Sequence, residues 1–136
     1  MQQVAEPFKP APPHTPSAGF DSAGDLAAMR RFAHQAAVAG GLDDDRAAAL
    51  EIAVSEIATN TLLHTHAGGL VRVWPDDAGL LICEIIDSGT FRRPQPQPQA
   101  HAKGGGWGLD LAGELSDGFF LHSEQGRSVW RLTFRL

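Results

Sequence analysis

The feature that most constrains this chain is an apolar stripe that repeats at three- and four-residue spacing through its middle. The stripe consists of Ala47, Leu50, Val54, Ile57 and Thr61. This spacing is typical of a helix that buries one face against a core. The aspartates at 43–45 suit a helix N-terminus, and the glycines at 68–69 end the pattern. The sequence therefore predicts one long helix between these two boundaries.

The segments on either side of this helix predict further helices and strands. Apolar residues recur at helical spacing over Leu26–Ala39, between a capping box that starts at Ser22 and the glycines at 40–41. Later segments are predicted as strands Leu70–Trp74, Leu80–Asp87, Phe119–His122 and Val129–Leu136, and as a short helix Leu109–Leu115. This order predicts an α+β fold, a two-layer α/β sandwich with a mainly antiparallel sheet and helices on one face.

The first 19 residues differ from the rest of the chain. They contain five of the nine prolines and no periodic apolar pattern. We interpret residues 1–19 as a disordered, proline-rich leader or as an interdomain linker. Residues 20–136 have the size of a single domain with one core.

Composition excludes several classes of function. The net charge of −5 argues against direct binding to nucleic acid or to an anionic membrane surface. The single cysteine, Cys83, excludes an intramolecular disulfide framework and a multi-cysteine zinc site. No apolar run approaches the roughly 20 residues of a membrane span, and no stretch resembles a signal peptide. We therefore expect a cytoplasmic protein.

Two polar residues of the long helix lie where apolar neighbours surround them. Glu56 and Asn60 are four residues apart, so they project from the same side of the helix. They mark either the edge of a solvated face or a carboxylate base beside an amide oxygen, in a cleft between helix and sheet. A carboxylate and an amide are costly to bury without partners. An amide oxygen, together with phosphate oxygens and waters, suits Mg²⁺.

Four segments resemble, in order, the motifs of the Bergerat-fold (GHKL) ATPases. Glu51–His64 resembles the N box of that superfamily, and Asp87–Gly89 resembles its first glycine box. Gly104–Leu109 resembles the second glycine box, and Ser128 stands where the family usually has a threonine near the adenine. Within the superfamily, Ala53–Asn60 is most similar to the hallmark phrase of the bacterial anti-sigma factor serine kinases.

The resemblance implies a role for each motif residue. Glu56 would be the general base, and Asn60 would ligate the Mg²⁺ that bridges the ATP phosphates. Asp87 would accept a hydrogen bond from the adenine amino group, and Gly89 would let the adenine approach the backbone. A short ATP lid would span about 88–108. Residues expected to contact the phosphates or to belong to this lid are Lys103, Gly104, Gly105, Gly106, Trp107, Gly108 and Leu109.

The function implied by the resemblance is that of an anti-sigma regulatory factor. Such a protein is an ATP-dependent serine kinase that phosphorylates an anti-anti-sigma partner of the STAS type, sequesters a sigma factor, or does both. The resemblance also implies a homodimer and, in some relatives, a sensory domain that precedes a proline-rich connector.

Two alternatives remain open. Phe91 replaces the last glycine of the first glycine box, and Arg127-Ser128 replaces the usual Gly-Thr. These departures suit a degenerate GHKL domain that acts as a non-catalytic partner-binding module. The second alternative is the catalytic domain of a sensor histidine kinase, which needs a phospho-accepting histidine on a dimerising helix hairpin.

Overall fold

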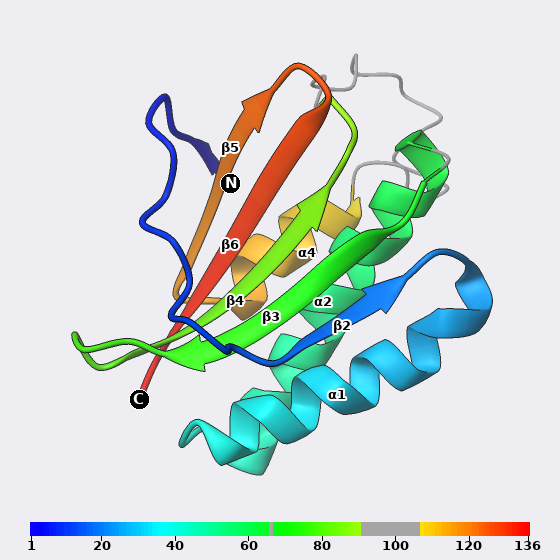
Figure 1. Cartoon of the computed structure of the whole chain (residues 1–136). Coiled ribbons are helices and arrows are strands. Elements are labelled where there is room, and N and C mark those ends of the chain that lie inside the picture. Colours follow the sequence, from blue (N-terminus) through cyan, green and yellow to red (C-terminus); the bar gives the residue numbers. More distant parts are fainter. Residues whose placement is uncertain (66, 91–106) are drawn as a thin grey trace.

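The structure, a computed structural model, describes residues 1–65, 67–90 and 107–136. A six-stranded sheet forms one layer, with strand order β1-β5-β6-β4-β3-β2. Helices α1, α2 and α4 form the second layer, on one side of the sheet (Figure 1). All neighbouring strands are antiparallel except β1 and β5, which are parallel. The predicted α+β sandwich is confirmed.

The helices begin and end close to their predicted boundaries. Helix α1 spans Leu26–Ala39, α2 spans Asp44–Thr65 and α4 spans Trp107–Leu115. The apolar stripe of α2 lies fully in the core, since each of its five residues is at most 1% exposed. At the start of α2, the side chain of Asp43 accepts a hydrogen bond from the Arg46 N–H at 2.8 Å. None of the described helices is both long enough and apolar enough to cross a membrane.

One of the two central strands of the sheet is β4, most of whose residues are buried. Strand β4 (Leu80–Asp87) lies between β3 (Gly69–Pro75) and β6 (Arg127–Arg135), and β5 (Gly118–Glu124) flanks β6. The side chains of this sheet that pack into the core include Leu81, Cys83, Ile85, Leu132 and Phe134. The antiparallel register brings Asp87, the last residue of β4, opposite Ser128 near the start of β6.

The N-terminal residues, which we interpreted as a disordered leader or an interdomain linker, contain two short strands. Gln2–Gln3 form β1, which pairs with β5, and Ser17–Phe20 form β2, which pairs with β3. Both are short edge strands in stretches without proline, and the five prolines lie between them, at 7–16. Proline cannot donate a hydrogen bond within a sheet, so the many prolines in this region argued against strands. The two strands lie on either side of the proline-containing stretch.

The segment between β1 and β2 covers part of the sheet face that the helices leave open. The guanidinium of Arg131, on β6, lies 4.8 Å from the ring centroid of Phe8 and 5.0 Å from that of Trp74. It also donates to the carbonyl of Lys9 and, at 2.6 Å, to the carboxylate of Glu84. Glu84 is 4% exposed, so this ion pair offsets the cost of burying its charge.

We predict that protonation of His122 strengthens the attachment of the N-terminal segment. Its Nε2 lies 3.0 Å from the Glu124 carboxylate and its Nδ1 lies 3.2 Å from the Val4 carbonyl. Both partners are acceptors, so only the imidazolium donates to both. The hydrogen bond with Glu124, and then that with Val4, raise the pKa of His122 above its ordinary value of 6.5.

The sign of the pH dependence follows from this raised pKa. The contribution to stability is fully present below pH 6.5 and is lost as pH rises through the folded-state pKa. An NMR titration of the His122 ring should give a pKa above 6.5. Glu124→Gln should lower that value, and a pKa that this substitution leaves unchanged would contradict the assignment.

Candidate functional site

A cavity of about 310 Å³ opens where the end of β4 meets α2, next to β6 and the start of α4. Its walls are formed by Asn60, Thr61, His64, Thr65, Asp87, Gly89, Thr90, Leu109, Ser128 and Trp130. Five of the predicted site residues are therefore brought together here: Asn60, Asp87, Gly89, Leu109 and Ser128.

The carboxylate of Asp87 is the most constrained group in this cavity. Asp87 is 5% exposed and ends the central strand β4. Its Oδ1 accepts a hydrogen bond from the Gly89 N–H at 2.9 Å. Its Oδ2 accepts one from the Thr61 hydroxyl and one from the Trp130 indole N–H, both at 3.0 Å. A carboxylate offers about four acceptor positions, so three donors leave one position for a ligand.

Gly89 is required by close packing between the loop after β4 and helix α2. A Cβ atom at this position would lie 2.2 Å from the Cγ2 atom of Thr65. The hydroxyl of Thr65 lies 2.8 Å from the Thr61 carbonyl, which holds the side chain in place. The glycine therefore lets the loop approach the helix and bring its N–H to Asp87.

Ser128 fixes the same loop from the side of β6. It is 1% exposed, and its hydroxyl donates to the Gly89 carbonyl at 2.8 Å. At the turn between β5 and β6, the Gly126 N–H donates to the Thr90 hydroxyl oxygen at 2.7 Å. Ser128 was predicted to lie near the adenine, and in the structure it holds the loop after β4 in place.

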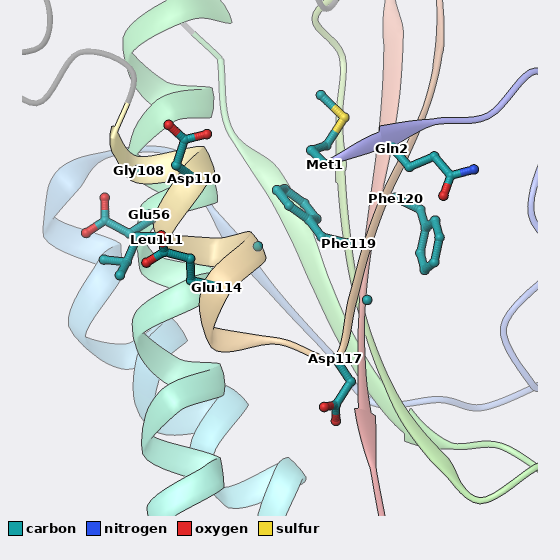
Figure 2. Close-up of a pocket in the computed structure, with 12 residues that line it drawn as sticks. Met1, Gln2, Glu56, Gly108, Asp110, Leu111, Glu114, Asp117, Phe119 and Phe120 are labelled. Atoms are coloured by element: carbon teal, nitrogen blue, oxygen red, sulfur yellow. The ribbon is translucent and has the colours of Figure 1, made fainter.

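Glu56 lines a different and larger cavity, of about 980 Å³. Figure 2 shows its carboxylate beside Gly108, at the start of α4. A Cβ atom on Gly108 would lie 2.8 Å from the Glu56 Oε2 atom, so α4 packs closely on this carboxylate. Leu109, the next residue of α4, lines the smaller cavity. The start of α4 therefore separates Glu56 from the cavity of Asn60.

The larger cavity has an acidic and partly aromatic lining. Three further carboxylates line it, those of Asp110, Glu114 and Asp117, together with the rings of Phe119 and Phe120 (Figure 2). Asp117 is paired with Arg46 at 2.7 Å, so its charge is already neutralised in part.

Several predicted site residues lie outside the described residues. These are Lys103, Gly104, Gly105 and Gly106, together with Phe91 and most of the expected lid at 88–108. Helix α4 begins at Trp107, two residues before the predicted start at Leu109, so Trp107, Gly108 and Leu109 all lie in its first turn. A helix N-terminus carries a partial positive charge that favours a phosphate.

Thr61 and Trp130, which both donate hydrogen bonds to Asp87, are among the cavity residues that were not predicted as functional. Thr61 was predicted as part of the apolar stripe of α2, although it is the only polar member of that stripe. Trp130 was predicted only as a strand residue. A buried hydroxyl and a buried indole N–H each need an acceptor, and this requirement was the available signal.

A metal ion at this site would depend on few protein ligands. Among the described residues, no group of three or more His, Cys, Asp or Glu side chains could hold a metal ion. Asn60 contributes an amide to the smaller cavity. An amide oxygen is among the ligands that Mg²⁺ accepts, and this ion needs few protein ligands because it keeps several waters and binds phosphate oxygens.

Comparison with known proteins identifies the family. Residues 21–134 match the model of the histidine kinase-like ATPase domain, and the chain therefore belongs to this family, which implies ATP binding. Its fold is similar to that of the RsbU and RsbW domains of Rv1364c from Mycobacterium tuberculosis, with a TM-score of 0.67 and 22% sequence identity. The similarity covers 90% of this chain and 33% of that chain. A search of curated proteins gave no match.

We predict that Gly89→Ala destabilises the domain. The added methyl group would collide with Thr65, and overpacking of this kind costs about 1–3 kcal/mol of the free energy of unfolding. Thr65→Ser removes the colliding methyl group and keeps the hydroxyl, so the double variant should recover part of the loss. Urea denaturation measures both effects, and a wild-type midpoint for Gly89→Ala would refute the packing argument.

Proposed function

We propose that this domain binds ATP in the 310 Å³ cavity and transfers the γ-phosphate to a serine hydroxyl of a protein partner. The observation that carries the proposal is the convergence of Asp87, Asn60 and Ser128 on one cavity, in a chain of the histidine kinase-like ATPase family. The resemblance of Ala53–Asn60 to anti-sigma factor serine kinases favours an anti-anti-sigma protein of the STAS type as the substrate.

Different residues of the cavity would bind different parts of the nucleotide. Asp87 would accept a hydrogen bond from the adenine amino group, because its carboxylate keeps one acceptor position. Gly89 and Ser128 would hold the loop beside the base. Asn60 would ligate Mg²⁺, which neutralises phosphate charge when bound.

Glu56 would act on the acceptor and not on the nucleotide. Its carboxylate lies on the larger cavity, which is wide enough to admit a side chain from another protein. From this position it would take the proton of the serine hydroxyl as that oxygen attacks the γ-phosphate. The close approach of Gly108 to the Glu56 carboxylate would place this base beside the helix whose N-terminus would face the phosphates.

A second candidate is a binding module that holds ATP and a sigma factor or its antagonist without transferring phosphate. The position of Glu56 outside the cavity of Asn60 favours it. The two candidates differ in what Glu56 contributes, so the same experiment separates them.

The test uses the full chain with ATP, Mg²⁺ and a panel of STAS-type proteins. Asn60→Ala should abolish Mg²⁺-dependent ATP binding in calorimetry. Glu56→Gln should bind ATP like the wild type and lose about 10²-fold or more in phosphoserine formation, the usual contribution of a general base. Thr59→Ala, at an exposed position of the same helix, should match the wild type in both assays.

Three outcomes would count against parts of the proposal. Phosphotransfer by Glu56→Gln at the wild-type rate would remove Glu56 from the mechanism. ATP binding without phosphoserine in any partner would support the non-catalytic module. Absence of ATP binding by the wild type would overturn both candidates.

A further inference from the structure

Trp130 places a large, immobilised ring against the buried end of β4. Trp130 is 2% exposed, and its ring stacks on that of Phe119 with centroids 5.9 Å apart. From this position the indole N–H points at Asp87 and donates to Oδ2 at 3.0 Å. Since packing fixes the ring, the direction of this hydrogen bond is fixed as well.

The donors around Asp87 are distributed unequally between its two oxygens. Oδ2 receives the Trp130 indole and the Thr61 hydroxyl, whereas Oδ1 receives only the Gly89 N–H. Each carboxylate oxygen offers about two acceptor positions. Oδ2 is therefore saturated, and the remaining acceptor position belongs to Oδ1.

We propose that Trp130 is a positioning residue that orients Asp87 for reading the amino group of a purine base. By occupying Oδ2, the indole holds the carboxylate so that Oδ1 accepts from the exocyclic amino group at purine position 6. Thr61 acts in the same way from helix α2. This inference rests on the proposed binding of ATP in the cavity.

The arrangement also determines which bases the pocket rejects. Asp87 is acceptor-only, so a carbonyl oxygen at purine position 6, as in hypoxanthine, would face an acceptor and leave both groups unpaired. Leaving buried polar groups unpaired costs more than the loss of a neutral contact. Discrimination between amino and carbonyl groups should therefore depend on how firmly Asp87 is held.

The experiment compares ATP with purine riboside triphosphate, which lacks the amino group. Affinities are measured by calorimetry with Mg²⁺ for the wild type and for Trp130→Phe, which keeps an aromatic ring and removes the N–H. We expect Trp130→Phe to weaken ATP binding roughly tenfold or more, since the bond it removes is made to a charged group. The affinity for purine riboside triphosphate should change less than about twofold, because no amino group is read.

A second pair of variants covers the case in which Trp130→Phe does not fold. Thr61→Val removes the other donor to Oδ2 at nearly constant volume, and Thr61→Ser retains the hydroxyl as its control. Thr61→Val should reproduce the selective loss of ATP affinity, and Thr61→Ser should bind both nucleotides like the wild type. Thermal melts establish that each variant is folded.

The outcomes distinguish this inference from the proposed function. Equal losses for both nucleotides in the folded variants would show that the two residues only support packing, and unchanged affinities would show that Asp87 needs neither. Wild type that binds both nucleotides equally well would overturn the reading of the amino group and leave nucleotide binding intact. Wild type that binds neither would overturn the proposed function itself.

Discussion

The arrangement of this domain depends on one buried carboxylate. Asp87 ends the central strand and accepts hydrogen bonds from helix α2, through Thr61, from strand β6, through Trp130, and from its own loop, through Gly89. A buried charge without partners would be costly, so these three elements are fixed relative to one another by the need to satisfy it. The 310 Å³ cavity forms where they converge. Ser128 completes the arrangement from the other side of the loop.

A second organising feature is the start of α4, which divides the site. Asn60 and Glu56 lie four residues apart on α2, yet they line different cavities, since Leu109 borders one and Gly108 the other. Phosphotransfer would require the acceptor hydroxyl to reach both Glu56 and the nucleotide past the start of α4, so the role of Glu56 distinguishes the kinase from the non-catalytic module. Gly108 packs so closely on Glu56 that a Cβ atom at this position would lie 2.8 Å from the Glu56 Oε2 atom.

The sequence predicted those parts of the fold that carry a periodic pattern. Leu26–Ala39 and Leu80–Asp87 were predicted to the residue, because apolar spacing and flanking turn residues define them. Strands β1 and β2 are too short to show an alternating pattern, and the prolines between them favoured a prediction of disorder. The hydrogen bond between Trp130 and Asp87 joins residues 43 positions apart and depends on the register of β6 against β4, which no local pattern contains. The separation of Glu56 from Asn60 likewise depends on where α4 packs.

In the proposed function, the cavity around Asp87 holds the nucleotide. The most direct measurement is an NMR titration of the ¹⁵N-labelled chain with ATP and Mg²⁺, which locates the ligand by the backbone amides whose shifts change. Saturable shifts should gather at Thr61, Gly89 and Ser128, with far smaller ones at Glu114 and Phe120, which line the other cavity. Saturable shifts at Glu114 and Phe120 without shifts at Gly89, or no saturable shift at all, would contradict the account.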